Sequence, residues 1–418
     1  MSQQTSAGSP AARQTVLPLW ALVLIIGSIV GIAMGRAQTM GLYQIPIVTQ
    51  LGVGREAFST AMAVTQLLMG LGAPFSGAFM DRFGAGRVIF ACVLMTIGGL
   101  YLMYAAKSPA DLLVSGALMG LGVSGTGVNS LAGIMGRMAP PEKRLSAIAS
   151  LGMAAGIGSF IALPFMHFLI ETTGWQTSLL WLMAITVLLI PLSWPISGRP
   201  QAQAAAPGVA VQVQTLKEAL SEAFAHPSFW LLTSGFFVCG FHVAFIMVHF
   251  PSYVRDVGLP GWVGPMALAI IGLGNIIGTF LVGQSGRYIE KRRGLSLIYF
   301  ARALIFVALL VVPPTPVTVL VLCGLLGLFW LATIPLTSGL VATFFGTSWM
   351  SMLFGIVFLS HQVGAFIGVW LAGRLFDATK SYEAMWWISI ALALISALLN
   401  WPIKEQPVAR LRVAQTKV

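Results

Sequence analysis

Four basic side chains of this sequence lie inside long apolar runs. They are Arg36, His242, Arg302 and His361, and each is flanked on both sides by mostly apolar residues. A cation near the centre of a bilayer costs about 2.5–3.5 kcal/mol on insertion scales, so each should face a protein interior or a water-filled cavity. Such groups can bind an anion, because a guanidinium offers two parallel donors to a carboxylate and stays charged when buried. The histidines could also carry a proton.

A repeat at an offset of 206 residues relates two of these groups. It places Arg36 over His242, and it also pairs Glu171 with Asp377. Repeated sets of membrane helices build a central site between two halves in many transporters. We therefore expect Arg36 and His242 to face one cavity from opposite halves. A cavity lined by cations from both sides selects anions.

The composition indicates that lipid surrounds most of the chain. Hydrophobic residues make up 57% of the sequence and charged residues 8%, against roughly 25% charged residues in soluble domains. Runs of about 20 apolar residues, long enough to cross a bilayer, occur near residues 18–43, 57–79, 88–106, 112–136, 145–170, 176–197, 228–250, 262–285, 295–313, 316–344, 349–373 and 384–403. Each must be helical, because unpaired backbone groups in lipid are costly. The expected fold is an all-α membrane protein with twelve transmembrane helices in two pseudo-symmetric six-helix bundles.

The polar segments divide the chain into five parts. We expect an N-terminal tail (1–17), a six-helix bundle (18–197), a linker with a short amphipathic helix (198–227), a second bundle (228–403) and a C-terminal tail (404–418). Most Lys and Arg residues fall on one side when the N-terminus is placed in the cytoplasm, so both termini should be cytoplasmic. Topology then explains the net charge of +11, and no nucleic-acid partner is needed.

The acids and cysteines narrow the chemistry further. All twelve Asp and Glu residues lie in loops or at the ends of the runs, so no carboxylate is expected near the midplane. Cys92, Cys239 and Cys323 lie in three different runs and read as small hydrophobes, not as a disulfide, metal or redox set. We expect no cofactor, no metal and no catalytic residues. A monomer in a bacterial inner membrane fits these features.

One loop carries a recognisable motif. The residues Gly77, Asp81, Arg82, Gly84 and Arg87, between the second and third runs, resemble the signature loop of the major facilitator superfamily. The resemblance implies that this loop is a conformational latch, in which the carboxylate pairs with neighbouring helices in one of two alternating states. The second copy of the motif has Arg287 in place of the acid.

Within that superfamily the chain looks most like the monocarboxylate and oxalate/formate branch. The similarity lies in the Gly-rich run 120–129, in the loop 137–144 and in the segment that begins at Gly156. Members of that branch commonly carry a substrate-binding Arg in the eighth span, whereas this chain offers Asn275 and Thr279 there.

These arguments give one set of expected site residues. Tyr43 follows Arg36 by seven positions, on the same helix face, and Asn129 is a polar residue in a Gly-rich run. Substrate contacts are expected from Arg36, Tyr43, Asn129, His242, Asn275, Arg302 and His361, and proton coupling from His242 and His361. Each has a simpler alternative: an Arg could snorkel or tie helices together, and a His or Asn could be a hydrogen-bonded packing residue.

The expected function is secondary active transport of a small organic anion, a monocarboxylate, by alternating access and proton symport. Export of an amphipathic drug or metabolite, and anion exchange, are the alternatives within transport. Drug export would call for a carboxylate inside the spans, which the sequence lacks. An intramembrane enzyme would need clustered catalytic side chains, and the five histidines are scattered. A sensor of the same fold would bind ligand without flux.

Overall fold

The protein folds as a bundle of twelve candidate membrane spans, seen in a computed structural model that describes residues 18–140, 143–197, 214–285, 288–346 and 349–411. The described residues contain helices and no strand, so the predicted twelve-span all-α fold is confirmed. In the first half the spans are α1 (Leu19–Gln38) with η1 (Thr39–Tyr43) and α2 (Gln44–Leu51); α3 (Arg55–Phe83); α4 (Ala85–Tyr104); α5 (Pro109–Thr126) with α6 (Val128–Met138); α7 (Arg144–Thr173); and α8 (Trp175–Val187) with α9 (Leu189–Ser193) and η3 (Trp194–Ile196). In the second half they are α11 (Pro227–Asp256); α12 (Val263–Ser285); α13 (Lys291–Val311); α14 (Pro316–Leu328) with α15 (Thr333–Phe345); α16 (Met350–Thr379); and α17 (Glu383–Asn400).

The expected tails and linker are only partly within the described residues. Residues 1–17, 198–213 and 412–418 lie outside them. The remainder of the linker contains α10 (Leu216–Phe224), which begins at a capping box in which Thr215 accepts from the Glu218 backbone N–H. The Glu218 carboxylate in turn accepts from the Thr215 backbone N–H, and that bond lowers the pKa of the carboxyl. The cap satisfies two backbone donors at the helix start.

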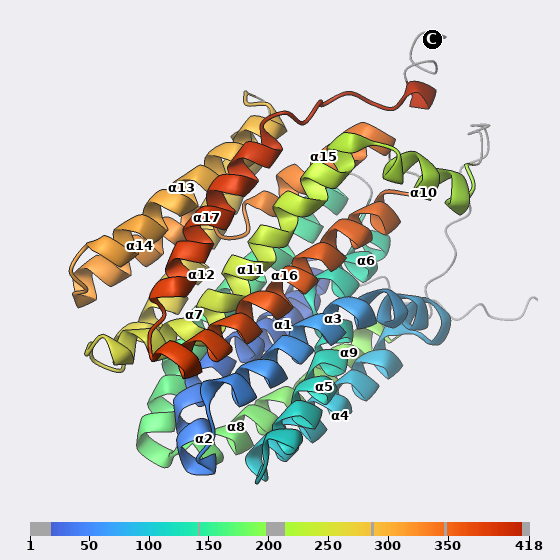
Figure 1. Cartoon of the computed structure of the whole chain (residues 1–418). Helices are drawn as coiled ribbons and strands as arrows, with labels where there is room; N and C mark the ends of the chain where they lie inside the picture. The colour runs from blue at the N-terminus through green and yellow to red at the C-terminus, as the bar shows by residue number, and fades with distance from the viewer. Residues whose placement is uncertain (1–17, 141–142, 198–213, 286–287, 347–348, 412–418) are drawn as a thin grey trace, which may run out of the picture.

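Helix pairing follows the 206-residue repeat (Figure 1). In the first half α1 packs on α7 and α3 packs on α5, while in the second half α11 packs on α16 and α12 on α14. The halves meet through two equivalent pairs: α3 against α16, and α7 against α12. Each of these pairs maps onto the other when the repeat is applied. The duplication read in the sequence is therefore present in the packing.

Two spans are interrupted at equivalent positions. The fourth span breaks at Gly127, which has an extended backbone between α5 and α6. The tenth breaks between Leu328 and Thr333, where α14 ends and α15 begins. The offset of 206 carries Gly127 onto Thr333. The sequence predicted one continuous run over 316–344, so this break is a departure from it. Interrupted helices are tolerated in a membrane where other groups satisfy the freed backbone atoms.

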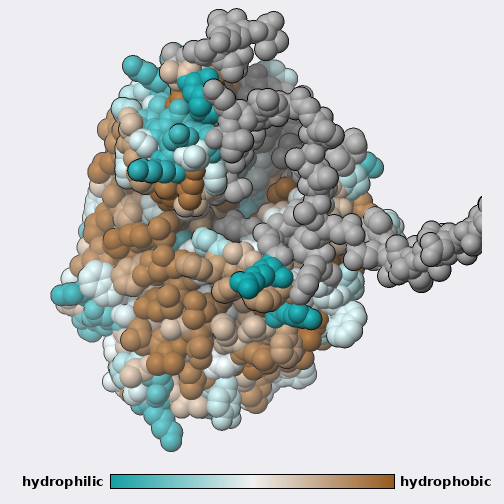
Figure 2. All heavy atoms as spheres, turned by 90° about the vertical axis from the view of Figure 1, so that its right-hand side faces the viewer, coloured by the Kyte–Doolittle hydropathy of each residue, from teal (hydrophilic) through white to brown (hydrophobic). Residues whose placement is uncertain are grey.

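Large apolar side chains cover much of the outside. Phe75 is 65% exposed, Phe280 65% and Leu398 72%, and each belongs to a different span. Figure 2, which views the side of the molecule where α10 lies, shows broad apolar areas with hydrophilic residues in separate groups. Soluble monomers rarely expose contiguous apolar surface on this scale. The surface therefore fits a lipid environment.

The two halves join most closely at one end of the bundle. We call this the α2 end, since it carries α2 and the α11–α12 loop, and we call the opposite end the α10 end (Figure 1). Among the described residues, hydrogen bonds between the halves run from Asp377, at the α2 end, to Gln362, whose Nε2 donates to the Gln66 carbonyl oxygen at 2.7 Å. At Gly41 of η1 the backbone lies so close to the Met247 carbonyl of α11 that no side chain would fit. The structure is thus a state closed at the α2 end.

Candidate functional site

Arg36 lies in the last turn of α1 and is almost fully buried, with 2% exposure. Ala33 and Ile29, one and two turns earlier on the same face, belong to the core of the first half. The Nε and Nη2 atoms of Arg36 have no hydrogen-bond partner among the described residues. A buried unpaired polar group is costly, and a buried charge more so. This guanidinium is therefore equipped to receive a ligand that brings its own acceptors.

Tyr43, one of the two residues expected beside Arg36, has a hydrogen-bond partner in another span. Tyr43 ends η1, is fully buried, and its hydroxyl oxygen accepts from Ser178 Oγ of α8 at 3.1 Å. That hydroxyl is thus engaged within the first half. Asn129 lies in α6, two residues after the break at Gly127, and its side chain is outside the described part of the structure.

His242 and His361 occupy the second half. His242 is buried in α11, where its Nε2 lies 3.0 Å from the Ser389 carbonyl oxygen of α17 and its ring meets Phe306 edge-on. His361 lies in α16 with 7% exposure, and its Nδ1 is 2.8 Å from Gln362 Oε1. The amide of Gln362 then reaches the first half. His361 is therefore one residue from a contact between the halves, whereas the hydrogen bond of His242 to Ser389 stays inside its own half.

Arg302 and Asn275 hold the break of the tenth span. Arg302 of α13 is fully buried and donates through Nε and Nη2 to the Phe329 carbonyl oxygen at 3.1 and 2.6 Å, and through Nη2 to that of Trp330. From α12, the Asn275 Oδ1 accepts from the Leu331 backbone N–H at 2.9 Å. A cation is favourable at a helix C-terminus, where carbonyls are free. These two side chains therefore satisfy the backbone that the break releases.

Cys239 belongs to the same group, although the sequence suggested only a small apolar residue. Its Sγ lies 3.3 Å from Thr333 Oγ1 and 3.7 Å from Arg302 Nη2. Three spans, α11, α12 and α13, thus contact the break in the tenth span. Arg302 Nη1 and the Tyr299 hydroxyl have no partner among the described residues. No signal in the sequence reveals this group, because its members lie far apart along the chain.

The structure does not bring all the expected site residues together. Arg302 and Asn275 meet at the break, and Cys239 joins them. Among the described residues, Arg36 forms no hydrogen bond with His242, His361 or Arg302, and it lies in the opposite half. In this state the basic groups of the two halves therefore form separate clusters.

The loop expected to be a latch lies at the α10 end, between α3 and α4. Gly84 has a φ of 89°, a conformation that favours glycine. Arg82 and Arg87 are exposed, and the Arg82 guanidinium lies 5.2 Å from the centre of the Phe83 ring. Gly77 lies within α3, and the Asp81 side chain is outside the described part of the structure.

A second polar group closes the α2 end, and we call it the α2-end cluster. Its members come from both halves: Gln44, Arg55, Ser59, His249, Asp256, Asp377 and Tyr382. Arg55 forms a two-point ion pair with Asp256, with N–O distances of 2.6 and 2.7 Å. The Asp377 carboxylate accepts from the backbone N–H groups of Arg55 and Glu56, so an acid of the second half caps a helix of the first.

The repeat in the sequence contains one signal for this cluster. Asp377 and Glu171 are equivalent in the repeat, and both contact the other half. Glu171 Oε1 accepts from Arg255 Nη2 at 2.9 Å. Each of these acids, at an equivalent span end, thus accepts hydrogen bonds from an arginine residue of the other half. Burial raises the pKa of the nearby Tyr382 phenol.

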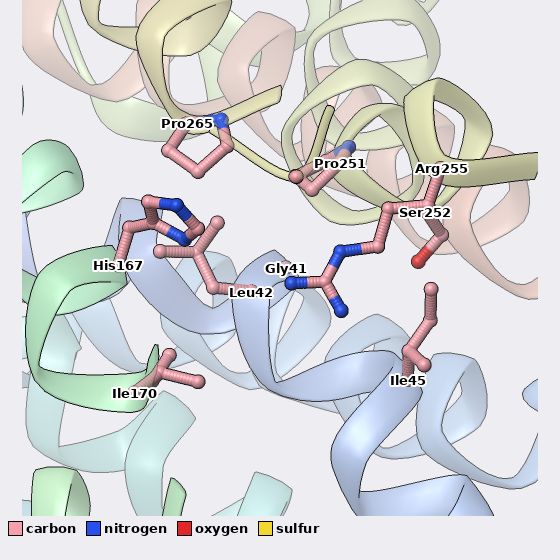
Figure 3. A pocket seen from close by; sticks show the side chains of 10 residues that line it. Gly41, Leu42, Ile45, His167, Ile170, Pro251, Ser252, Arg255 and Pro265 are labelled. Carbon is pink, nitrogen blue, oxygen red and sulfur yellow. The ribbon is translucent and has the colours of Figure 1, made fainter. Parts of the chain in front are cut away.

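A small pocket lies beside this cluster, between the halves. Figure 3 shows Arg255 reaching from α11 toward Gly41 and Leu42, with His167 and Ile170 on the opposite wall. Its volume is about 10 Å³, which is close to the space of one water molecule. The pocket is therefore too small, in this state, to hold an organic solute.

Comparison with known proteins gives a consistent result. The model of a family described as Major Facilitator Superfamily matches residues 24–369. An uncharacterised MFS-type transporter of Bacillus subtilis is 25% identical over 86% of this chain and 88% of its own length. Monocarboxylate transporter 11 of Mus musculus is 22% identical over 91% and 86%, and the oxalate:formate antiporter of Oxalobacter formigenes is 26% identical over 56% and 55%.

Solved structures share the fold. A bacterial homologue of the human lysosomal transporter Spinster, in an inward-facing and unoccupied conformation, has a TM-score of 0.68 and 17% identity, with 95% of this chain and 96% of that chain covered. A D-xylose–proton symporter has a TM-score of 0.68 and 13% identity, with coverage of 93% and 99%. At these identities the likeness concerns the fold alone.

Proposed function

The chain belongs to the major facilitator superfamily, and from this we propose that it transports a small organic anion, a monocarboxylate, across the membrane in which it lies. The family assignment makes it an integral membrane transporter and not an enzyme. The similarity to monocarboxylate transporters and to an oxalate:formate antiporter supports this class of solute.

The observation that carries the proposal is the unpaired guanidinium of Arg36. Two of its buried nitrogens have no acceptor among the described residues. Each ion pair among the described residues lies near one end of the bundle. Examples are Arg55 with Asp256 at the α2 end and Lys291 with Glu405 at the α10 end. A substrate carboxylate would supply the missing charge and the missing acceptors. A charge-assisted hydrogen bond of this kind contributes about 1.5–3 kcal/mol.

We propose that a proton accompanies the anion and that His361 is its protein carrier. Its ring bonds to Gln362, whose amide crosses to the first half, so a change of charge at His361 would be felt where the halves meet. His242 is the second candidate. Arg302 and Asn275 are assigned the supporting task of holding the tenth span.

Anion exchange is the second candidate function. The similarity to the oxalate:formate antiporter favours it, because an antiporter exchanges one solute for another. Exchange needs a second anion on the opposite side and no proton gradient. The two functions therefore differ in what drives flux.

Purified protein in proteoliposomes tests these assignments. Uptake of radiolabelled monocarboxylates, dicarboxylates and aromatic acids would be measured with a pH gradient, with an uncoupler, and with liposomes preloaded with unlabelled anion. The proposal expects saturable monocarboxylate uptake that collapses with the uncoupler. Uptake that needs internal anion and ignores the uncoupler would establish exchange. Uptake of cationic amphiphiles alone would reject the anion proposal.

The oligomeric state, the membrane and the orientation are proposals as well. We propose a monomer in a bacterial inner membrane with both termini in the cytoplasm, so that the α2 end faces outward. The basic residues near the α10 end, such as Arg82, Arg87 and Arg292, support this orientation. Labelling of a cysteine introduced at exposed Ala105 by an impermeant reagent in intact cells tests it, since only an outward α2 end would react.

A further inference from the structure

His249 forms hydrogen bonds with both halves. It lies in α11, is fully buried, and has two contacts on each ring nitrogen. From the first half come the side chains of Gln44, at the start of α2, and of Ser59 in α3. From the second half come the carbonyl oxygen of Val369 in α16 and the hydroxyl of Tyr382. The imidazole therefore links four segments at the α2 end.

The partners of the ring determine where its proton is. The Val369 carbonyl, 3.0 Å from Nε2, can only accept, so Nε2 carries the hydrogen. Ser59 Oγ, 3.2 Å from Nε2, donates its own hydrogen to the Arg55 carbonyl and can also accept from Nε2. This leaves Nδ1 as the acceptor. The ring is thus neutral with a defined tautomer.

The contacts of Nδ1 agree with that assignment. The Tyr382 hydroxyl lies 2.8 Å from Nδ1 and accepts from Arg55 Nη1 at 3.0 Å, so its own hydrogen is available for Nδ1. Gln44 Nε2 lies 3.3 Å from Nδ1, while Gln44 Oε1 accepts from Ser252 Oγ at 2.7 Å. Both groups present donors to Nδ1. A second ring proton would face two donors.

From this arrangement we propose that His249 holds the α2 end shut only as the neutral imidazole, so that its protonation opens this end. The α2-end cluster would then be a proton-sensitive gate. The inference goes beyond the proposed function, and it does not depend on which solute is carried.

The charged groups around the ring support the same direction. Tyr382 faces it from the α16–α17 loop, and Arg55 lies one hydrogen bond further, from α3. The carboxylates of Asp256 in α11 and Asp377 in α16 are engaged by Arg55 and by the start of α3, where Glu56 also lies. Arg255, the arginine of α11, pairs with Glu171 of α7. The helix α2 contributes no charged residue. A protonated ring would therefore add a second cation beside Arg55, and none of the four groups bonded to the ring is a carboxylate.

Opening of the α2 end removes this conflict. Once the halves separate there, water can solvate the ring, and the imidazole can titrate near its ordinary value of about 6.5. Because the open state binds the proton more tightly than the closed state, lowering the pH shifts the population toward the open state. The shift begins as the pH falls through the pKa of the open state.

A distance measurement across the α2 end tests the proposal without any substrate. Spin labels would be placed by Ala105→Cys and Val257→Cys, two exposed positions in opposite halves near this end, in protein reconstituted into nanodiscs. The native cysteines Cys92, Cys239 and Cys323 are buried, which favours labelling of the introduced pair. Distance distributions would be recorded at a pH of about 8 and of about 5, on either side of the imidazole range.

The proposal expects a short label distance at the higher pH. At the lower pH, the population with a longer label distance should increase. In His249→Gln, which keeps a neutral donor, the label distance should stay short at both pH values. In His249→Arg, whose guanidinium stays charged when buried, the label distance should be long at both pH values. The matched control is His226→Gln, the same change at the opposite end of α11, and it should keep the response of the parent protein.

Three results would overturn the proposal. They are a parent protein whose label distances do not change with pH, a full pH response in His249→Gln, and a short label distance in His249→Arg. A His249→Gln protein that is long at both values would also count against it, because shape and not charge would then control the gate. Size-exclusion profiles of each variant would establish that it is folded. Failure here leaves anion transport untouched, since no flux is measured.

Discussion

Arg302 donates through Nε and Nη2 to the carbonyl oxygen of Phe329, at 3.1 and 2.6 Å, and so binds the end of α14 where the tenth span is interrupted. A guanidinium expected from the sequence to touch substrate thus has a backbone partner from another span. Half-helix ends near the midplane of transporters line solute sites or hinges. Arg302 is therefore a positioning residue for this break.

Changing Arg302 to Lys should reduce turnover and stability more than affinity. A Lys ammonium keeps the charge but cannot present the fork that spans the Phe329 and Trp330 carbonyls. We expect a lower melting temperature and a lower maximal rate, with a nearly unchanged KM. The loss should correspond to roughly 1.5–3 kcal/mol, the worth of one charge-assisted bond. The exposed Arg374, changed to Lys, is the control. A large rise in KM with normal stability would instead make Arg302 a substrate ligand.

Asp377→Asn should weaken closure at the α2 end. The carboxylate accepts from the backbone N–H groups of Arg55 and Glu56 at 2.9 and 2.8 Å, and an amide offers one acceptor for the two. The label pair at positions 105 and 257 should therefore show a longer distance even at the higher pH. Asp111→Asn is the matched control, because Asp111 caps α5 in the same way but within one half. Equal responses of the two variants would refute a role of Asp377 between the halves.

Asp81→Asn should slow transport while leaving insertion and substrate affinity largely intact. As the expected latch, this acid would bias the two access states without touching the cavity. Initial rates and KM in proteoliposomes separate these effects. Unaltered turnover would reduce Asp81 to a residue of the loop without a role in the cycle.

Uptake should rise as the external pH falls from about 8 to about 6, because the proposed symport carries a proton with the anion. At still lower external pH the α2 end should fail to close as His249 becomes charged, so the rate should fall again. His249→Gln should remove only this acidic decline. Uptake that is flat across the range and indifferent to an uncoupler would reject proton symport in favour of exchange.

The spans could be predicted because the length and hydropathy of a run report directly on contact with lipid. The break of the tenth span could not. Its residues Phe329 to Ala332 contain neither Gly nor Pro, and the groups that stabilise it come from Asn275 and Arg302, more than twenty residues away in sequence. The residue pattern within an apolar run carries no information on partners that lie so far away in the sequence.

The site was predictable to a similar depth. A buried Arg36 without an acidic partner follows from the absence of acids inside the runs, and the structure has it so among the described residues. The surroundings of His249 depend on how the halves lie against each other, which a single sequence does not encode locally. The hydroxyl of Tyr43, which was expected to lie beside Arg36, accepts a hydrogen bond from Ser178 of α8. Helix periodicity gives a face but not the neighbour that covers it.

Binding and uptake by Arg36 variants test the central claim most directly. Equilibrium binding of a transported monocarboxylate would be measured for the parent protein, Arg36→Lys and Arg36→Ala, with Arg374→Ala as a control for loss of an exposed arginine. Arg36→Lys should weaken affinity by roughly 10- to 150-fold, the equivalent of one charge-assisted bond. Arg36→Ala should abolish saturable binding and uptake while the protein still folds and melts as before, since the buried charge it removes has no partner among the described residues. Normal binding and transport by folded Arg36→Ala would contradict the assignment of this chain as an anion carrier anchored at Arg36.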